Sequence, residues 1–550
     1  MLLKTFCRDA RLNRLQSTPP IRSLAPEEGS FEIPLWGVPL VLMILWVCLF
    51  SGLGAIGLVG PDEPRYAAIA RAMAETHDWI TPRLWGTPWF EKPVLYYWTA
   101  GLAMRLFGVG EFAARLPSAL AGLLAVAAAA WAALRSYGLG PAWYTLIMLP
   151  TSVAMIGFSR AAGPDMLFAA LLTAAMAVAV EILQRDKPRP IWQIAFGFFL
   201  GAAVLAKGPA AVILAGGATL AWAAISRQWL APFRFLHPVV LAVFGVTALP
   251  WYVLCAIRNP DFLRIFLWQH NFERYTTPIF EHRQPFWYYG YILLLAVVPW
   301  IIAFLAALLV AIIRLKNKAA IVSNEMFFAS WALFPVLFFS ISQSKLPGYI
   351  LPAIPPLFIL LGRWVSESVA KKTKGEVLAF ALTGIALIVL AVALGIIRFG
   401  GPYEARTARY RLAVITFVVG GSIVVLALRK QTMAACWLMA LMVFSTVEIA
   451  NQLVLPQLDS VISCRQLAKK LLQDGVREED LSVYGISRAR NYGLDYYMNR
   501  ELPTWAPGKS EPEWILGWPP PDSRTANQYI VVDANPNDEY VNMTSLYRKK

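Results

Sequence analysis

The chain of 550 residues is strongly apolar, with 58% hydrophobic and 15% charged residues. This composition excludes an ordinary soluble globular protein and is typical of a protein that crosses a membrane several times. The formal net charge is +15, but the basic residues are scattered among apolar stretches. The charge therefore argues against nucleic-acid binding and suits cytoplasmic loops and anionic lipid or phosphate ligands. The sequence contains no P-loop, dinucleotide-binding, GxSxG or HExxH motif, and its cysteines lack metal-ligand spacing.

Residues 1–33 are basic, and they are too long and polar for a cleaved signal peptide, which predicts a cytoplasmic tail. Residues 34–456 contain about thirteen apolar runs of membrane-spanning length, which predicts an all-α polytopic membrane domain. Every second loop is short and basic, which places these loops in the cytoplasm and the two chain ends on opposite sides. The runs lie near residues 34–58, 111–134, 141–158, 164–184, 191–206, 208–226, 236–256, 286–313, 324–342, 346–363, 376–398, 410–428 and 432–454.

The first outside loop, residues 59–110, concentrates charges where a span meets the membrane surface. Tryptophans, tyrosines and prolines lie between these charges, which predicts shaped interfacial helices. Such residues are often only interfacial anchors, but charges at this depth are costly unless they face a cavity or take part in chemistry. We favour a site, in which Arg65 and Tyr66 orient Asp62. The charged candidates in this loop are Asp62, Glu63, Arg65, Glu91 and Lys92.

Two later outside turns each carry one lysine beside proline and glycine, Lys207 and Lys345. Either lysine alone could be an interfacial residue whose ammonium reaches water. Because both lie on the same side as Lys92, we interpret all three as phosphate contacts, with Tyr349 as a hydrogen-bonding neighbour. Another outside turn ends in Asp165, which is either a helix cap or a second acid that faces the site.

Residues 257–285 form a second outside loop, with basic residues and histidines among phenylalanines and tryptophan. This pattern predicts an interfacial helix followed by an arm, and the loop is long enough to cover the first one. Arg274 is a further candidate for phosphate contact. A divalent metal cation could be bound if His282 and Glu91 met across the cavity; otherwise both would form ordinary solvated or ionic contacts. No other cofactor is expected.

Residues 457–550 are polar and contain no further span. Residues 460–474 fit a helix, whereas residues 481–486 and 529–533 fit strands. The sequence therefore predicts a small α/β domain outside the membrane. No catalytic constellation is apparent in it, so we expect a scaffolding or lipid-surface role.

Three motifs carry a resemblance to a known family. They are DEPRYA with DWITPRLWGTPWFEKP in the first outside loop, QPFWYY at 284–289 and SKLPGYILPAIPPL at 344–357. On these motifs the chain resembles bacterial 4-amino-4-deoxy-L-arabinose lipid A transferases, which are GT-C enzymes of glycosyltransferase family 83 and similar to protein O-mannosyltransferases. The resemblance covers most of the membrane domain, whereas residues 457–550 match by position alone.

The resemblance implies a GT-C-type catalytic membrane domain and a periplasmic C-terminal domain. It implies transfer of 4-amino-4-deoxy-L-arabinose from undecaprenyl phosphate to a lipid A phosphate, with inversion at the sugar, at the periplasmic face of the bacterial inner membrane. The implied partners are the lipid-linked sugar, lipid A and membrane lipids, with no nucleic acid, and a monomer is expected. The added cationic sugar would weaken the binding of polymyxin and other cationic peptides. Related transferases carry an acid in the turn that ends in Asp165, which favours this residue as a second acid.

Asp62 is the first candidate for the catalytic acid, with Glu63 as its partner. For a protein hydroxyl as the acceptor, Asp62 would act as a general base. A lipid A phosphate is already ionised, so Asp62 would instead orient the acceptor, hold a cation or bind the amino group of the sugar. The basic candidates would stabilise the charge that develops on the leaving phosphate.

Two other functions compete with this interpretation. One is a related transferase that moves a polyprenyl-linked sugar to protein or to another glycan. The other is a flippase for lipid-linked sugars, but transporters usually place charges at the bilayer midplane within internal repeats. Here the charges gather at one face, which disfavours transport.

Overall fold

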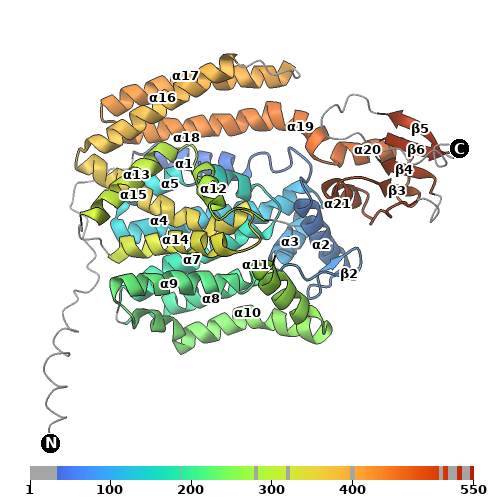
Figure 1. Cartoon of the computed structure of the whole chain (residues 1–550), viewed down its shortest axis with the longest axis horizontal. Coiled ribbons are helices and arrows are strands. Elements are labelled where there is room, and N and C mark those ends of the chain that lie inside the picture. The colour runs from blue at the N-terminus through green and yellow to red at the C-terminus, as the bar shows by residue number, and fades with distance from the viewer. Residues whose placement is uncertain are drawn as a thin grey trace, which may run out of the picture.

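The structure is a computed structural model that describes residues 34–185, 187–277, 283–317, 323–396, 403–506, 512–517, 529–534 and 545–550. The predicted cytoplasmic tail lies outside these residues. Helices form most of the molecule, and a small α/β unit lies at one end of the helical body (Figure 1). The predicted class, a polytopic helical protein with a small C-terminal sheet, is confirmed.

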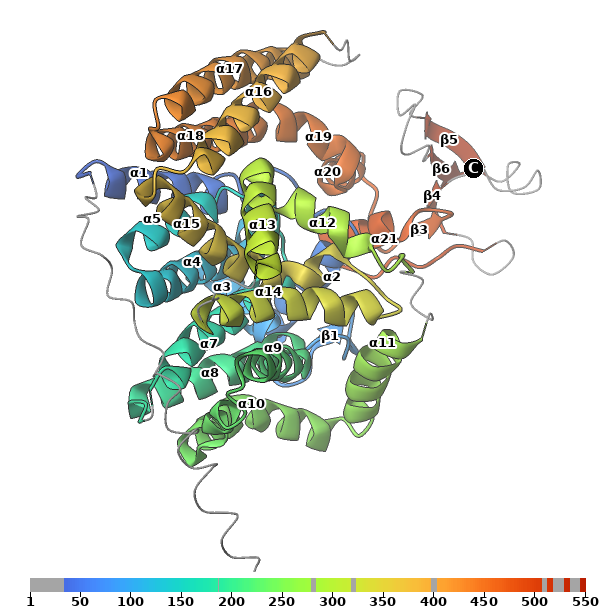
Figure 2. The same ribbon diagram turned by 60° about the vertical axis from the view of Figure 1, so that its left-hand side comes forward.

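Each predicted span contains a helix or consecutive helices. Figure 2 shows α16 and α17 side by side, and α12 and α13 next to one another above α14. The elements of the membrane domain are α1 (Gly37–Leu45), η1 (Trp46–Phe50), α4 (Glu111–Tyr137), α5 (Leu139–Met148), α6 (Val153–Ser159), α7 (Pro164–Leu183), α8 (Pro190–Lys207), α9 (Ala210–Ser226), η2 (Ala231–Leu236), α10 (Pro238–Arg258), α12 (Tyr288–Ala296), α13 (Ile301–Lys316), α14 (Ser323–Ile341), η4 (Pro347–Ala353), α15 (Ile354–Ala370), α16 (Lys374–Ile396), α17 (Tyr403–Leu428), α18 (Thr432–Ile449), η5 (Ala450–Val454) and α19 (Leu455–Ile462).

Fewer of these helices than predicted have the length of a full span. Within the described ranges, nine helical segments are long and apolar enough to cross a membrane, or ten if the bent pair α5 and α6 is one span. The count of about thirteen is therefore not confirmed. The run that begins at residue 34 stays apolar beyond Phe50, but its glycine-rich continuation at Gly52, Gly54 and Gly57 is not helical. Helix α9 has only 17 residues, so it is short for a full span. Helices α5 and α6 are separated by a bend of 61°, so neither forms a full span alone.

The first outside loop folds into α2 (Asp62–Thr76), a hairpin of β1 (Arg83–Leu84) and β2 (Thr87–Pro88), and α3 (Leu95–Phe107). Helices α2 and α3 pack against each other. Asp62 is the first residue of α2, whereas Glu91 and Lys92 lie just before α3. Because the two helices are neighbours, residues some thirty positions apart meet at one place. The second outside loop contains η3 (Arg264–Glu273) and α11 (Arg274–Thr276).

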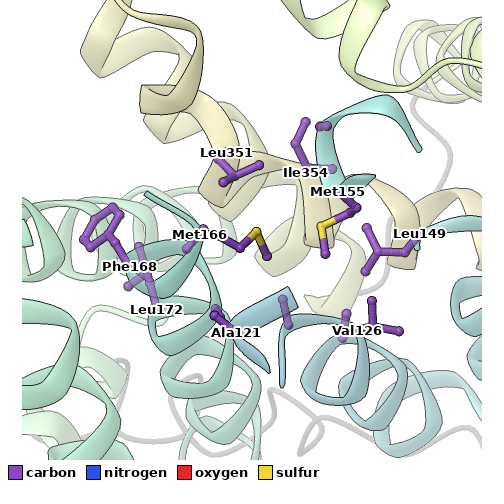
Figure 3. Packing of buried hydrophobic residues seen from close by; sticks show 14 of the residues in the cluster. Ala121, Val126, Leu149, Met155, Met166, Phe168, Leu172, Leu351 and Ile354 are labelled. Carbon is purple, nitrogen blue, oxygen red and sulfur yellow. The ribbon is translucent and has the colours of Figure 1, made fainter. Parts of the chain in front are cut away.

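The core surrounds α7, all of whose best membrane-spanning window is buried inside the protein. Its alanine-rich sequence allows α4 and α8 to approach closely, since small side chains permit close contact between membrane helices. Figure 3 shows side chains from α4, the α5–α6 region, α7 and the η4–α15 region in one cluster; the labelled residues are Ala121, Val126, Leu149, Met155, Met166, Phe168, Leu172, Leu351 and Ile354. This packing fixes the starts of α7 and η4, which border the candidate site.

The C-terminal unit contains α20 (Arg465–Gln473), α21 (Arg488–Tyr497) and the strands β3 (Leu481–Tyr484), β4 (Trp514–Gly517), β5 (Tyr529–Ala534) and β6 (Ser545–Lys549). The strand order is β3-β4-β6-β5, with β3 and β4 parallel and the other pairs antiparallel. Helix α21 packs against α2 (Figure 1). The C-terminal unit thus touches the element on which Asp62 lies.

Candidate active site

A polar cavity of about 190 Å³ lies where the outside loops converge. The first outside loop, the start of α7, the end of α8, the second outside loop and the start of η4 all contribute to its wall. The residues that line it are Asp62, Glu63, Tyr66, Glu91, Lys92, Phe158, Ala161, Ala162, Gly163, Pro164, Asp165, Met166, Lys207, Arg274, Leu346 and Tyr349. The fold therefore brings most of the predicted site residues together. The cavity is smaller than a typical drug-sized pocket, so it suits a head group whose lipid chain stays outside.

Arg65 connects the two carboxylates at one side of the cavity. Its Nη2 lies 2.5 Å from Asp62 Oδ1 and 3.1 Å from Glu91 Oε2. Arg65 is buried, with 3% of its side chain exposed, whereas 56% of the Asp62 side chain is exposed. Asp62 is thus held by a rigid partner while it remains accessible from the cavity. This placement agrees with the orienting role predicted for Arg65; Tyr66 lies beside it and lines the cavity.

Glu91 lies between three cations. Its carboxylate oxygens are 3.1 Å from Arg65 Nη2, 3.6 Å from Lys92 Nζ and 3.2 Å from Arg274 Nη1. Burial by itself would raise the pKa of Glu91, but Lys92, Arg65 and Arg274 outweigh it and hold that pKa far below its usual value. Burial and then the neighbouring Arg274 lower the pKa of Lys92 to about 8. One acid among three cations leaves an excess of positive charge, which suits a phosphate.

Asp165 and Lys207 form an ion pair in the wall of the cavity. Lys207 Nζ lies 2.6 Å from Asp165 Oδ1, and 4.9 Å from the centroid of the Tyr349 ring. Gly348 makes this arrangement possible, because a Cβ at this position would collide with Asp165 Oδ2 and with the ring of Phe158. The LPGY segment therefore needs a glycine at this position, because its backbone lies close to the carboxylate of Asp165.

Glu63 is held by buried hydrogen bonds, which favour a structural role over the catalytic one that the sequence predicted. Its carboxylate accepts hydrogen bonds from Arg115 Nε at 3.0 Å and Nη2 at 2.6 Å, and from the backbone N–H groups of Val59 and Ala162 at 2.7 and 2.6 Å. Arg115 also donates to the carbonyl oxygens of residues 53, 56 and 57. This buried pair fixes the loop that precedes Asp62. Sequence analysis missed Arg115, because an arginine near the start of an apolar helix is also typical of an interfacial anchor.

Lys345, although predicted to contact phosphate, is not among the residues that line the cavity. Lys345 Nζ donates to the carbonyl oxygens of Gln284 at 3.0 Å and Ser342 at 2.6 Å, so its ammonium ties two outside turns together. This placement does not bring Lys345 to the phosphate position that the sequence suggested. His282 lies outside the described residues. The described part of the chain contains no group of three or more His, Cys, Asp and Glu side chains that could hold a metal ion.

His270, which the sequence analysis did not single out, belongs to the same electrostatic cluster. Burial lowers the pKa of His270 to about 4, although Glu91 pulls this pKa upward. His270 is therefore neutral at pH 7. The signal that could have identified it is its position on the same helical segment as Arg274, one turn earlier.

The fold and the site define a membrane glycosyltransferase that uses lipid-linked sugars. Residues 35–266 match the family described as Dolichyl-phosphate-mannose-protein mannosyltransferase. The crystal structure of ArnT from Cupriavidus metallidurans bound to undecaprenyl phosphate has the same fold, with a TM-score of 0.74 and 24% identity over 93% of this chain and 97% of that one.

The similarity to curated proteins is more specific. An undecaprenyl phosphate-alpha-4-amino-4-deoxy-L-arabinose arabinosyl transferase from Edwardsiella ictaluri is 30% identical over 79% of this chain and 83% of its own length. The protein of the same name from Serratia proteamaculans is 31% identical over 66% of this chain and 65% of its own length. The chain belongs to this arabinosyl transferase family.

Proposed function

We propose that the protein transfers 4-amino-4-deoxy-L-arabinose from undecaprenyl phosphate to a phosphate group of lipid A. The names of the curated relatives support the sugar and its lipid carrier. The observation that carries the proposal is the cluster of Lys92, Arg274 and Lys207 around one small cavity. Such a cluster binds a phosphate and not a neutral group.

The proposed reaction is a displacement at the anomeric carbon of the sugar. An oxygen of the acceptor phosphate forms a bond to this carbon while the bond to the donor phosphate oxygen breaks. The electron pair of the broken bond leaves with undecaprenyl phosphate, and the configuration at the sugar inverts. Lys92 and Arg274 stabilise the charge that grows on the leaving group, and the Lys207–Asp165 pair borders the same space.

The proposed acceptor determines the task of Asp62. A lipid A phosphate is already ionised near pH 7, so no strong base is needed to activate it. The exposed carboxylate of Asp62, held by Arg65, instead suits the cationic amino group of the sugar or the orientation of the acceptor. Catalysis then rests on positioning and on stabilisation of the leaving phosphate.

We further propose that the cavity faces the periplasm from the inner membrane and that the protein acts as a monomer. The short basic loops on the opposite side support this orientation. At the periplasmic face, the enzyme would replace negative charge on lipid A by the positive charge of the sugar. Binding of polymyxin and of other cationic antimicrobial peptides would weaken as a result.

Mass spectrometry of lipid A tests the proposed function. The protein is produced in cells that synthesise the donor but lack their own arabinosyl transferase. Lipid A is expected to gain the mass of aminoarabinose. An unmodified lipid A together with a modified protein or glycan would favour the other transferase function, and donor that moves across the membrane without any transfer would favour a flippase.

Activity should depend on the protonation of Lys92. With a pKa of about 8 in the free enzyme, Lys92 loses its positive charge as the pH rises through this value. We therefore expect kcat/KM to fall above about pH 8, since kcat/KM reports ionisations of the free enzyme. The Lys92→Arg variant keeps its charge at high pH, so any activity that remains should no longer fall there. A profile of the wild type that stays flat to pH 10 would contradict this assignment.

Transfer should also continue when divalent cations are removed. Three basic groups within 3.6 Å of Glu91 would repel a divalent cation and already supply the positive charge for the phosphate. We expect less than about a twofold change in rate after treatment with EDTA. Loss of activity that Mg²⁺, Mn²⁺ or Zn²⁺ restores would show instead that a metal is required.

A further inference from the structure

Arg65 is enclosed by three aromatic rings. Its Cζ lies 5.3 Å from the ring centroid of Tyr66, 5.5 Å from that of Trp89 and 5.5 Å from that of Tyr492. Its Nε is buried and has no hydrogen-bond partner within the described residues. The rings, together with the carboxylates of Asp62 and Glu91, therefore determine where this guanidinium lies. A buried arginine between aromatic faces is held by cation–π attraction that water does not weaken.

One ring of this aromatic cage comes from the C-terminal unit. Tyr492 lies on α21, whereas Tyr66 and Trp89 belong to the first outside loop. Arg488 also lies over the Tyr492 ring, with its Cζ 5.5 Å from the centroid. Tyr492 is thus fixed between a cation of its own helix and the guanidinium that contacts Asp62.

The same unit is anchored to the loop that leads to Asp62. Tyr497 Oη accepts a hydrogen bond from the backbone N–H of Leu58 and donates one to Glu111, both at 2.8 Å. Within α19, the helix that leads into this unit, Asp459 accepts a hydrogen bond from the backbone N–H of Gly57 at 2.6 Å. These contacts fix α21 relative to α2, so Tyr492 is held in its place in the cage.

We propose that Tyr492 is a positioning residue for the transfer reaction: the C-terminal unit completes the cage of Arg65 and thereby sets the orientation of Asp62 and Glu91. The polar domain is then part of the catalytic apparatus and not only a scaffold. This inference rests on the proposed function for its kinetic consequence, although the cage itself is a property of the fold.

The kinetic test compares Tyr492→Leu with Tyr492→Phe in purified full-length protein. Leucine removes the aromatic face, and we expect kcat to fall about tenfold while the affinity for undecaprenyl phosphate stays within about twofold. Phenylalanine keeps the face and is expected to restore most of the lost rate. Tyr484→Leu is the matched control, since Tyr484 packs on Trp505 inside the same unit and should leave kcat unchanged.

A double-mutant cycle tests the cage without any assay of transfer. Thermal unfolding is measured for Arg65→Met, Tyr492→Leu and the double variant. The double variant is expected to lose less stability than the sum of the two single variants, since either change removes the same contact. Additive losses would overturn the cage, and a kcat for Tyr492→Leu equal to that of the wild type would overturn the positioning role. If the wild type transferred no aminoarabinose, the proposed function would fail. The double-mutant cycle would still show whether Arg65 and Tyr492 interact.

Discussion

Replacing Asp62 by asparagine is expected to lower kcat for aminoarabinose transfer by about a thousandfold. The variant keeps the size of the side chain but removes the charge that Arg65 holds at the edge of the cavity. Binding of undecaprenyl phosphate should stay within about threefold, because the phosphate contacts come from Lys92, Arg274 and Lys207. The measurement combines steady-state transfer rates with titration of undecaprenyl phosphate onto purified protein.

Asp261→Asn is the matched control for this prediction. Asp261 is an exposed acid of the second outside loop, with 71% of its side chain accessible, and it forms an ion pair with Arg264, three residues further along the chain. Its loss should leave kcat unchanged. If Asp62→Asn transferred sugar at the rate of the wild type, the central acid would have to be Asp165 or Glu63, which also line the cavity.

Glu63→Gln should be the most destabilising of the substitutions at the site. The amide leaves Arg115 buried without its opposite charge, and breaking one side of a buried pair costs about 3–5 kcal/mol. We expect a large fall in the thermal unfolding temperature of the detergent-solubilised protein. Activity should be lost because the loop that precedes Asp62 no longer folds correctly, and not because a proton-transfer group is missing.

Glu75→Gln provides the comparison on the same helix. Its partner Arg71 and Glu75 itself are partly exposed, so their ion pair contributes at most about 1 kcal/mol and little change is expected. A Glu63→Gln protein with the stability of the wild type but no activity would contradict the structural role. It would return Glu63 to the catalytic role that the sequence predicted.

Sequence motifs located the site because its residues cluster in outside loops. Asp62, Glu91 and Lys92 stand in one segment, and so dense a set of charges at the membrane surface is costly unless it faces a cavity or takes part in chemistry. Lys207 and Asp165 lie at the ends of different spans, and their side of the membrane followed from the distribution of basic loops. Their ion pair forms because α7 and α8 pack against each other. The pattern of charges along the sequence does not predict this packing.

Sequence patterns are less reliable where one residue type serves two purposes. Lys345 stands beside proline and glycine as Lys207 does, yet its ammonium binds backbone carbonyls. Glu63 and Asp62 are adjacent, but on a helix adjacent side chains point in different directions, and Asp62 is much the more exposed of the two. Tyr492 lies some four hundred residues from Arg65, so its contact follows from tertiary packing alone.

Hydropathy marks apolar runs, but a run need not form one helix with the length of a full span. An apolar run indicates that a segment avoids water. A glycine-rich break or a bend can still divide this segment into helices that are too short for a full span. The bent pair α5 and α6 and the short α9 are such pieces. Helix α6 contacts α7, and α9 begins three residues after Lys207, so both pieces lie next to elements that border the cavity.

Reconstituted transfer tests the central claim most directly. Purified wild-type protein and the Lys92→Met variant are placed in liposomes with undecaprenyl phosphate-linked aminoarabinose and lipid A, and both lipids are followed by mass spectrometry. We predict that the wild type produces aminoarabinose-modified lipid A and free undecaprenyl phosphate in equal amounts, and that the variant produces neither at a measurable rate. Equal rates for the two proteins, or consumption of the donor without modification of lipid A, would contradict the account.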